Sequence, residues 1–310
     1  MKKNVVADIS LLMVAFVWGT TFVVVQNAIS ILPPHSFNAV RFALASITLL
    51  IIILLKDKKS LLKISTKELS AGITLGFFLF GGYAFQTVGL LYTTASKAGF
   101  ITGLSVVLVP LLSVLFLRII PKWPTVLGVI LAAFGLYLLT MIGEKTFQFG
   151  DILVFFCAVF FALQIVFTGK FAPNYRVLVL AFFQVSVVSI LSFAFAILNE
   201  DFFQIISFSK LTESKVITAL VITSVFATAL AFWAQTAFQR YTTPTRVAII
   251  FAMEPVFAAL TSFIVLGEIL KRSAMIGGLL IFLGMILAEI PAETIHSIFQ
   301  ISSKKSLKRL

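Results

Sequence analysis

Ten apolar runs of about 20 residues follow one another along the chain. About 20 helical residues cross a hydrocarbon core of ~30 Å, so each run is long enough for a transmembrane helix. The composition agrees, because 60% of the 310 residues are hydrophobic and 12% are charged. We therefore expect an all-α integral membrane protein that has no soluble domain. The expected helices lie near 8–28, 36–55, 69–91, 97–117, 123–142, 151–170, 177–198, 216–238, 244–266 and 273–290.

The net charge of +12 is best interpreted as a topology signal. If the N-terminus is cytoplasmic, the segments on that side of the membrane hold 17 of the 24 Lys and Arg residues, and those on the other side hold 6. Such an excess is typical of cytoplasmic loops, so no nucleic-acid partner is expected. We predict a multi-pass protein of the cytoplasmic (inner) cell membrane with both termini cytoplasmic. The basic tail, residues 291–310, either lies on an anionic membrane face or is disordered.

The two halves of the sequence resemble each other. "ADISLLMVAFVWGTTFVV" (7–24) aligns with "GDILVFFCAVFFALQIVF" (150–167) at an offset of 143, and "QTVGLLYTTASKAGF" (86–100) aligns with "QTAFQRYTTPTRVAI" (235–249) at 149. These alignments predict two five-helix domains, 8–142 and 151–290. Because five is odd, the second copy enters the membrane from the other side. Inverted repeats are typical of secondary transporters, although a duplication could also serve only to stabilise a bundle.

Glycines and prolines are expected to have structural roles. Gly128 and Gly135 match Gly277 and Gly284 at the offset of 149, and small residues let helix backbones approach closely. We expect the fifth and tenth helices to serve in packing or as the surface of a homodimer. In "YTTP" we expect Thr243 to cap a helix that starts at Pro244. The prolines expected inside helices are Pro110 and Pro255.

Glu254 is the most informative polar residue. It lies ten residues beyond Pro244, or about 15 Å along a helix, which places it near the membrane midplane. An ionised carboxylate there is costly unless it faces a hydrated cavity or has partners. Glu254 is therefore either a site for a proton or a cationic group, or a protonated acid that hydrogen-bonds to a neighbouring helix at a proline kink. Its counterpart in the first copy is Ser105.

Other polar and aromatic residues are candidates for the same site. Arg41 is interpreted either as a side chain that snorkels to the interface or as a donor to a substrate carboxylate or to Glu254. Trp18 and Phe22 share a helix face with Thr21, and for these two aromatic residues ordinary packing is the alternative. Lys97 and Arg246 are expected to be interfacial anchors. The remaining candidates are Gln164, Gln184, Tyr83, Gln86 and Gln235.

Several segments resemble a known family. "WGTTFVV", "GLLYTTASKAGFITG", "YTTPTRVAIIFAMEPVFAAL" and "GEIL" are similar to the EamA family of the drug/metabolite transporter superfamily, over about 8–290. The resemblance implies ten helices around a central cavity, and transport of small metabolites or drugs, often as export. The Glu-Pro pair at Glu254 is common in that family. The second copy reads "FFALQIVF" and lacks the Trp-Gly pair of the first.

Other classes of function have little support. An ATP-driven pump would need a phosphate-binding G-x-x-x-x-G-K-[ST] loop, and a zinc enzyme an H-E-x-x-H pair; the sequence has neither. With two His and one Cys, we expect no enzyme, cofactor or metal. The expected function is proton-coupled export of small solutes, such as amino acids or amphipathic compounds, by alternating access. The alternatives are an uncoupled facilitator or channel, and a membrane scaffold or sensor.

Overall fold

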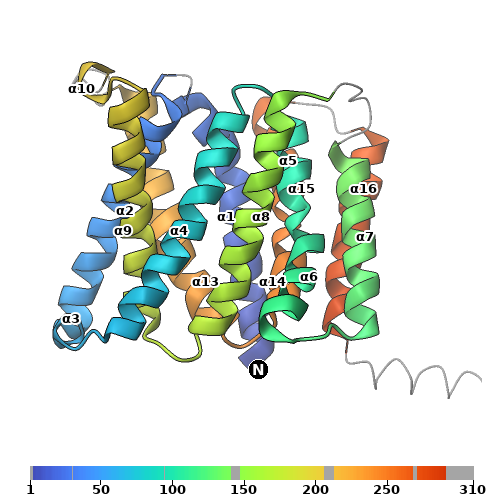
Figure 1. Cartoon of the computed structure of the whole chain (residues 1–310). Coiled ribbons are helices and arrows are strands. Elements are labelled where there is room, and N and C mark those ends of the chain that lie inside the picture. Colours follow the sequence, from blue (N-terminus) through green and yellow to red (C-terminus); the bar gives the residue numbers. More distant parts are fainter. Residues whose placement is uncertain are drawn as a thin grey trace, which may run out of the picture.

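The chain folds into a bundle of helices (Figure 1). The computed structural model describes residues 3–29, 31–93, 95–140, 147–205, 213–267 and 271–290, and within these ranges it contains no strand. The all-α expectation is confirmed. The basic tail, 291–310, lies outside the described residues.

Six of the first nine expected spans are single continuous helices. Their bounds agree with the apolar runs to within a few residues, because uninterrupted apolar sequence can satisfy its backbone in lipid only as a helix. Two short helices, α3 (Lys59–Leu62) and α10 (Phe202–Ile205), lie at the ends of the bundle. The six are α1 (Lys3–Ile29), α2 (Pro34–Asp57), α4 (Thr66–Gly89), α7 (Trp123–Thr140), α8 (Phe149–Phe171) and α9 (Val177–Asn199).

Within the described residues, nine helical segments are long and apolar enough to cross a membrane. The last helix, α16 (Arg272–Glu289), has a shorter apolar stretch, Arg272–Ala288. It nevertheless lies along α7 for most of the length of that helix (Figure 1). The exact count of ten spans therefore stays a prediction.

Both fourth spans of the two halves are broken, where we expected continuous helices over 97–117 and 244–266. The first comprises α5 (Ala95–Gly103) and α6 (Ser105–Leu117), and the second α14 (Pro244–Phe251) and α15 (Glu254–Leu266). At the second break the amide of Met253 donates to the carbonyl of Ile250, three residues back, at 3.0 Å. Pro255 has no amide hydrogen to restore the regular pattern. The kink expected at Pro255 is thus a full interruption, whereas α6 runs through the buried Pro110 without one.

The eighth span also departs from the expected single helix over 216–238. It consists of α12 (Ser214–Val221), a π-helix labelled η1 (Ile222–Leu230) and α13 (Ala231–Gln239). π-Helical segments are rare and occur frequently at functional sites.

The expected start of the next helix is confirmed. Thr243 Oγ1 accepts from the amide of Arg246 at 3.4 Å, and Pro244 is the first residue of α14.

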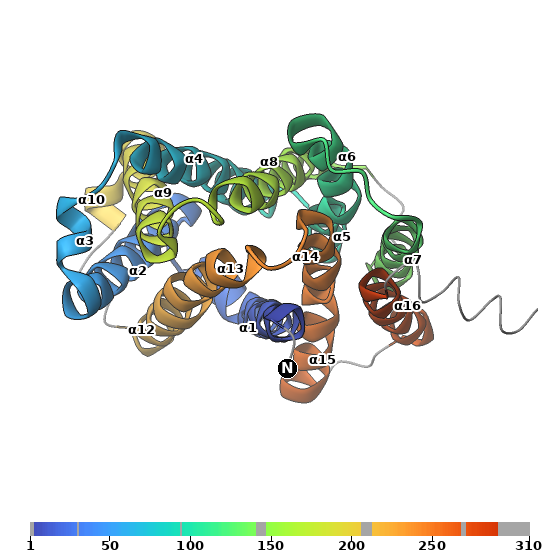
Figure 2. The ribbon, with the colours of Figure 1, turned by 90° about the horizontal axis from the view of Figure 1, so that it is seen from below.

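The two halves pack into each other. In Figure 1, α1 starts at the lower face, where the N-terminus is marked, and α8 starts at the upper face. We call these the N-terminal face and the opposite face. The first helix of each half packs mainly against helices of the other half: α1 against α13, α14 and α15, and α8 against α4, α5 and α6 (Figure 2). The central bundle is therefore built from exchanged helices.

The backbones of α7 and α16 approach each other closely. A methyl group built at Gly128 would lie 2.6 Å from the carbonyl oxygen of Gly284, and one at Gly135 would lie 2.6 Å from that of Gly277. The glycine faces of α7 and α16 are therefore buried against each other within the chain. A homodimer remains a prediction and would have to use another surface. Gly99, by contrast, has no neighbour within 4 Å of an added methyl group and lines a cavity described below.

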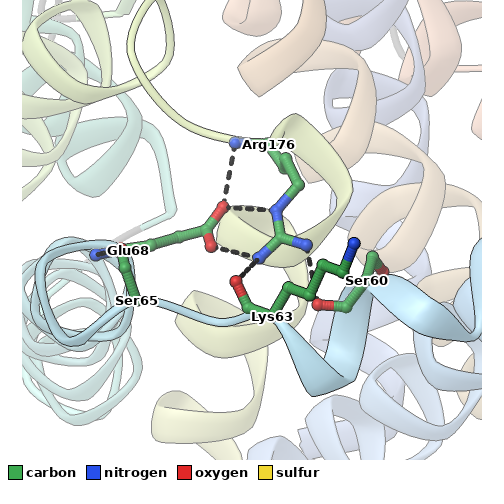
Figure 3. Close-up of polar contacts among 5 residues, drawn as sticks. All are labelled: Ser60, Lys63, Ser65, Glu68 and Arg176. Carbon is green, nitrogen blue, oxygen red and sulfur yellow. Dashed lines mark hydrogen bonds and ion pairs between the residues drawn. The ribbon is translucent and has the colours of Figure 1, made fainter.

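A polar cluster joins helices at the N-terminal face (Figure 3). The Arg176 amide and its Nε each donate to Glu68 Oε1 at 3.0 Å, and its Nη2 pairs with Glu68 Oε2. The same guanidinium donates to the carbonyls of Ser60 and Lys63 at 2.6 and 3.1 Å. Because Ser65 Oγ also accepts from the amide of Glu68, the cluster fixes the starts of α4 and α9 together.

Large apolar side chains cover the outside of the bundle. Leu55, Leu198 and Ile264 are 81%, 78% and 77% exposed, respectively. A water-soluble protein rarely exposes so much contiguous apolar surface. The surface is suited to a bilayer, and the chain is a multi-pass membrane protein.

Candidate functional site

A cavity of about 560 Å³ lies inside the bundle. Ile29, Asn38, Thr93 and Thr140, which line it, come from helix ends at the opposite face. Its deepest residues include Trp18, from the middle of α1. The cavity therefore extends from the opposite face to the middle of the bundle.

The bundle is tightly packed between the cavity and the N-terminal face. The ring centroid of Trp18 lies 5.0 Å from that of Phe251 and 5.3 Å from that of Phe232. Closer to the N-terminal face, Leu11 and Val166 belong to one hydrophobic cluster and are completely buried. The cavity is thus closed toward the N-terminal face.

Glu254 lines the cavity and is the first residue of α15. The positive end of a helix dipole favours a carboxylate at this position. The backbone at Glu254 is held by α1, because a methyl group built at Gly19 would lie 2.5 Å from the Glu254 carbonyl oxygen. The carboxyl group is therefore presented to the cavity by a rigid crossing of two helices, where it can bind a proton or a cationic group.

Arg41 lies inside the bundle, so the snorkelling alternative is wrong. It is 3% exposed, and its Nε donates to Thr228 Oγ1 of η1 at 2.8 Å. The guanidinium carbon lies 5.3 Å from the ring centroids of both Phe42 and Tyr83. Arg41 and Glu254 both line the cavity but form no ion pair with each other. One basic and one acidic side chain thus line the cavity without being paired to each other.

The expected face of α1 is only partly described. Trp18 and Thr21 line the cavity, and the Trp18 Nε1 donates to the carbonyl of Ala227 in η1 at 2.8 Å. Thr21 Oγ1 donates to the carbonyl of Val17 at 2.8 Å. Phe22 lies outside the residues whose side chains the structure describes. Trp18 therefore combines packing with a specific hydrogen bond.

Residues of α4 form another wall. Tyr83 and Gln86 both line the cavity, and Gln86 Nε2 donates to Thr102 Oγ1 of α5 at 3.3 Å. Thr102 Oγ1 also lies 3.7 Å from the sulfur of Cys157, which is buried behind it.

Among the described residues, no group of three or more His, Cys, Asp or Glu side chains could hold a metal ion.

Sequence reasoning missed the role of the π-helix. Through Ala227 and Thr228, η1 binds both Trp18 and Arg41. Its sequence, "ITSVFATAL", has no Gly or Pro that would have marked an irregular helix. The contacts could be recognised only once α1, α2 and η1 were placed side by side.

The glutamines form a hydrogen-bonded group between the cavity and the N-terminal face. Gln164 of α8 donates from Nε2 to Gln184 Oε1 at 3.1 Å and accepts at Oε1 from Gln235 Nε2 at 3.0 Å. Gln184 Nε2 donates to Thr236 Oγ1 at 3.1 Å, and Gln239 Nε2 donates to the carbonyl of Ile165 at 2.5 Å. We call Gln164, Gln184, Gln235, Thr236 and Gln239 the glutamine network. Gln164 and Gln235 line the cavity, whereas Gln184 does not.

Lys97 and Arg246 are not simple interfacial anchors. Lys97 is 2% exposed, and its Nζ lies 3.5 Å from Oδ2 of Asp151, so it ties α5 to α8. Thr93 Oγ1 also donates to this carboxylate. Arg246 Nε donates to the carbonyl of Ala288 at 3.0 Å and ties α14 to α16. Lys97 therefore joins helices of the two halves, and Arg246 joins two spans of the second half.

Comparisons with known proteins match the whole bundle. The sequence model of the EamA-like transporter family matches residues 5–141 and again 148–289. An uncharacterized transporter of Archaeoglobus fulgidus is 38% identical over 288 residues, covering 93% of this chain and 87% of that protein. The uncharacterized transporter YyaM of Bacillus subtilis is 33% identical over 169 residues, covering 50% of this chain and 53% of that protein.

A solved structure shares the fold. It superimposes with a TM-score of 0.78 at 19% sequence identity, and the match covers 94% of this chain and 99% of that protein. The likeness therefore concerns the arrangement of the helices alone.

Proposed function

The chain belongs to the EamA-like transporter family, and on that premise we propose that it moves a small solute through the central cavity by alternating access. The observation that supports this mechanism is that the cavity extends to the opposite face and is closed toward the N-terminal face. A channel would need a path open to both faces at once. A cavity open to one face at a time fits a transporter whose site is exposed alternately.

We infer that the two halves are inverted repeats and that both termini are cytoplasmic, in the inner cell membrane. The opposite starting faces of α1 and α8, and the excess of Lys and Arg on the N-terminal side, support this orientation. The solute would then be a metabolite or drug that is exported. Its class would be small and amphipathic, such as an amino acid, because the cavity combines aromatic walls with Glu254 and Arg41.

Glu254 is proposed as the coupling residue. A carboxylate exchanges a proton when access to water alternates between the two sides of the membrane, and Glu254 lies at the cavity surface beside a helix break. The alternative role, a structural acid that stabilises the break, predicts no link between transport and a pH gradient.

Two steps test the proposed transport. Metabolites in cells and medium are first compared with and without the protein, which identifies a solute whose distribution depends on it. The purified protein is then placed in vesicles, and entry of that labelled solute is measured. Alternating access predicts saturable entry at rates far below those of a channel. Equal distribution of the solute in both cell cultures would speak against transport, and conduction of the solute as an electrical current would favour a channel.

A further inference from the structure

The glutamine network joins helices that belong to different packing groups. It connects α8, which packs with α4 to α6, to α13, which packs with α1. It also connects both of these helices to α9 through Gln184. All five members are at most 2% exposed. The network therefore crosses the seam that has to separate if the N-terminal face is to open.

Each member has a counterpart in the other half of the sequence. At the offsets of 143 and 149 residues, the counterparts of Gln164, Gln184, Gln235, Thr236 and Gln239 are Thr21, Arg41, Gln86, Thr87 and Leu90. All five counterparts line the cavity. In the described part of the chain, no side-chain hydrogen bond joins these counterparts to one another. Equivalent residues are thus bonded together on one side of the middle and separated by the cavity on the other.

We propose that the glutamine network is a latch that holds the N-terminal face closed, and that its five counterparts close into the equivalent latch when the opposite face closes. This inference rests on the alternating access proposed above. Thr236 and Gln239, which the sequence had not marked, become positioning residues for transport. In the second state Arg41 takes the place of Gln184 and bridges Thr21 and Thr87.

The chemistry of the network suits a latch that must open repeatedly. A hydrogen bond contributes only about 0.5–1.5 kcal/mol net, because separated amides and hydroxyls regain hydrogen bonds to water. The helices on the two sides of the seam can therefore separate into a hydrated cavity with a small change in free energy. When they are packed together, the buried amides still need specific hydrogen-bond partners.

The network also offers a contact to the solute. Gln235 Oε1 is buried and has no hydrogen-bond partner, and Gln235 lines the cavity. A solute N–H or O–H group can donate to this oxygen. Binding would then act directly on a residue whose Nε2 holds Gln164. The structure thus assigns to the latch a preference for solutes that carry a hydrogen-bond donor.

Three of the five matched positions differ between the two latches, and at one of them the side chain that replaces the amide cannot form a hydrogen bond. Gln239, which donates across the seam to the carbonyl of Ile165, is replaced by Leu90 in the other half. The latch of the opposite face therefore lacks the donor that Gln239 supplies across the seam. This weaker latch is in keeping with a structure in which the opposite face is the open one.

The experiment exchanges the two residues. In a Cys157→Ser background, Ala259→Cys on the cavity wall reports access from the opposite face, and Val166→Cys on α8 reports access from the N-terminal face. Membrane-impermeant thiol reagent is applied to each side of reconstituted vesicles. Gln239→Leu weakens the present latch and Leu90→Gln strengthens the other. Each should slow labelling at residue 259, and speed labelling at residue 166, by about five- to tenfold.

The control is Ser189→Ala, which removes a buried hydroxyl that donates to the carbonyl of Ala39 between α9 and α2, away from the seam. It should leave both labelling rates unchanged. If Gln239→Leu does not yield folded protein, Leu90→Gln alone decides, because Leu90 faces the cavity. Unchanged rates in that variant, with residue 166 still labelled in the parent protein, would overturn the latch and leave alternating access intact. A residue 166 that is never labelled in any variant would overturn both.

Discussion

The fourth spans of the two halves have similar backbones, but their side chains differ in chemistry. Each breaks near its middle, and the second helix of each begins at equivalent residues, Ser105 and Glu254, both on the cavity wall. Duplication has therefore placed two helix N-termini at the cavity. Only one of them carries an acid. The repeated backbone therefore provides the path, and Glu254 in place of a serine makes the chemistry of these two helix starts one-sided.

The largest expected effect comes from moving the acid. Glu254→Ser should abolish the acceleration of transport by a pH gradient, because Glu254 is the one acidic residue among the described residues that line the cavity. Adding Ser105→Glu should restore part of it, since the new acid would also start a helix at the cavity. The measurement is solute flux with and without an imposed pH gradient. An unaltered pH response in Glu254→Ser would remove Glu254 from the coupling.

The crossing at Glu254 is tighter than its counterpart, and this difference can be measured. Gly19 faces Glu254, whereas the equivalent residue on α8 is Ala162. Gly19→Ala places a methyl group 2.5 Å from a backbone oxygen, so it should destabilise the protein by about 1–3 kcal/mol.

The matched change Ala162→Gly should cost about 0.5–1 kcal/mol, the usual loss for glycine within a helix. Denaturation in detergent measures both variants. Equal losses would mean that the two crossings are equivalent and that α1 does not specifically hold Glu254.

A smaller effect is expected at Trp18, whose counterpart is Phe161. Trp18→Phe keeps the ring and removes the hydrogen bond to the carbonyl of Ala227, so it should cost about 0.5–1.5 kcal/mol. Trp233→Phe is the control, because the Trp233 indole has no hydrogen bond among the described residues. A melting temperature that falls equally in both variants would show that the bond to η1 contributes nothing specific.

The sequence was informative wherever a rule acts along a single helix. The apolar runs predicted most helix ends, and Thr243 with Pro244 predicted the start of α14. The cost of a charge in an apolar run pointed to Arg41 and Glu254, and both line the cavity. The offsets between the copies pair residues of the glutamine network with residues that line the cavity.

Features that depend on neighbouring helices could not be predicted. Apolar residues lie on both the lipid-facing and the inward faces of these helices, because lipid and protein interior favour the same residues, so periodicity does not reveal which helices touch. The exchange of α1 and α8 between the halves therefore left no pattern in the sequence. The π-helix η1 likewise contains no Gly or Pro that would mark it, and the break at Leu104 follows Gly103 with no Pro beside it. Charge counting alone could not distinguish Arg176, which binds Glu68, from a topology signal.

The most direct test of the central claim is the accumulation ratio of the identified solute in vesicles that contain the wild-type protein. The solute is supplied at equal concentration on both sides, and a pH gradient is then imposed across the vesicle membrane. A cavity that opens to one face at a time and exchanges a proton at Glu254 predicts that the solute becomes concentrated on one side until the pH gradient decays. A ratio that stays at one, with the solute still crossing the membrane, would contradict the account and identify an uncoupled facilitator.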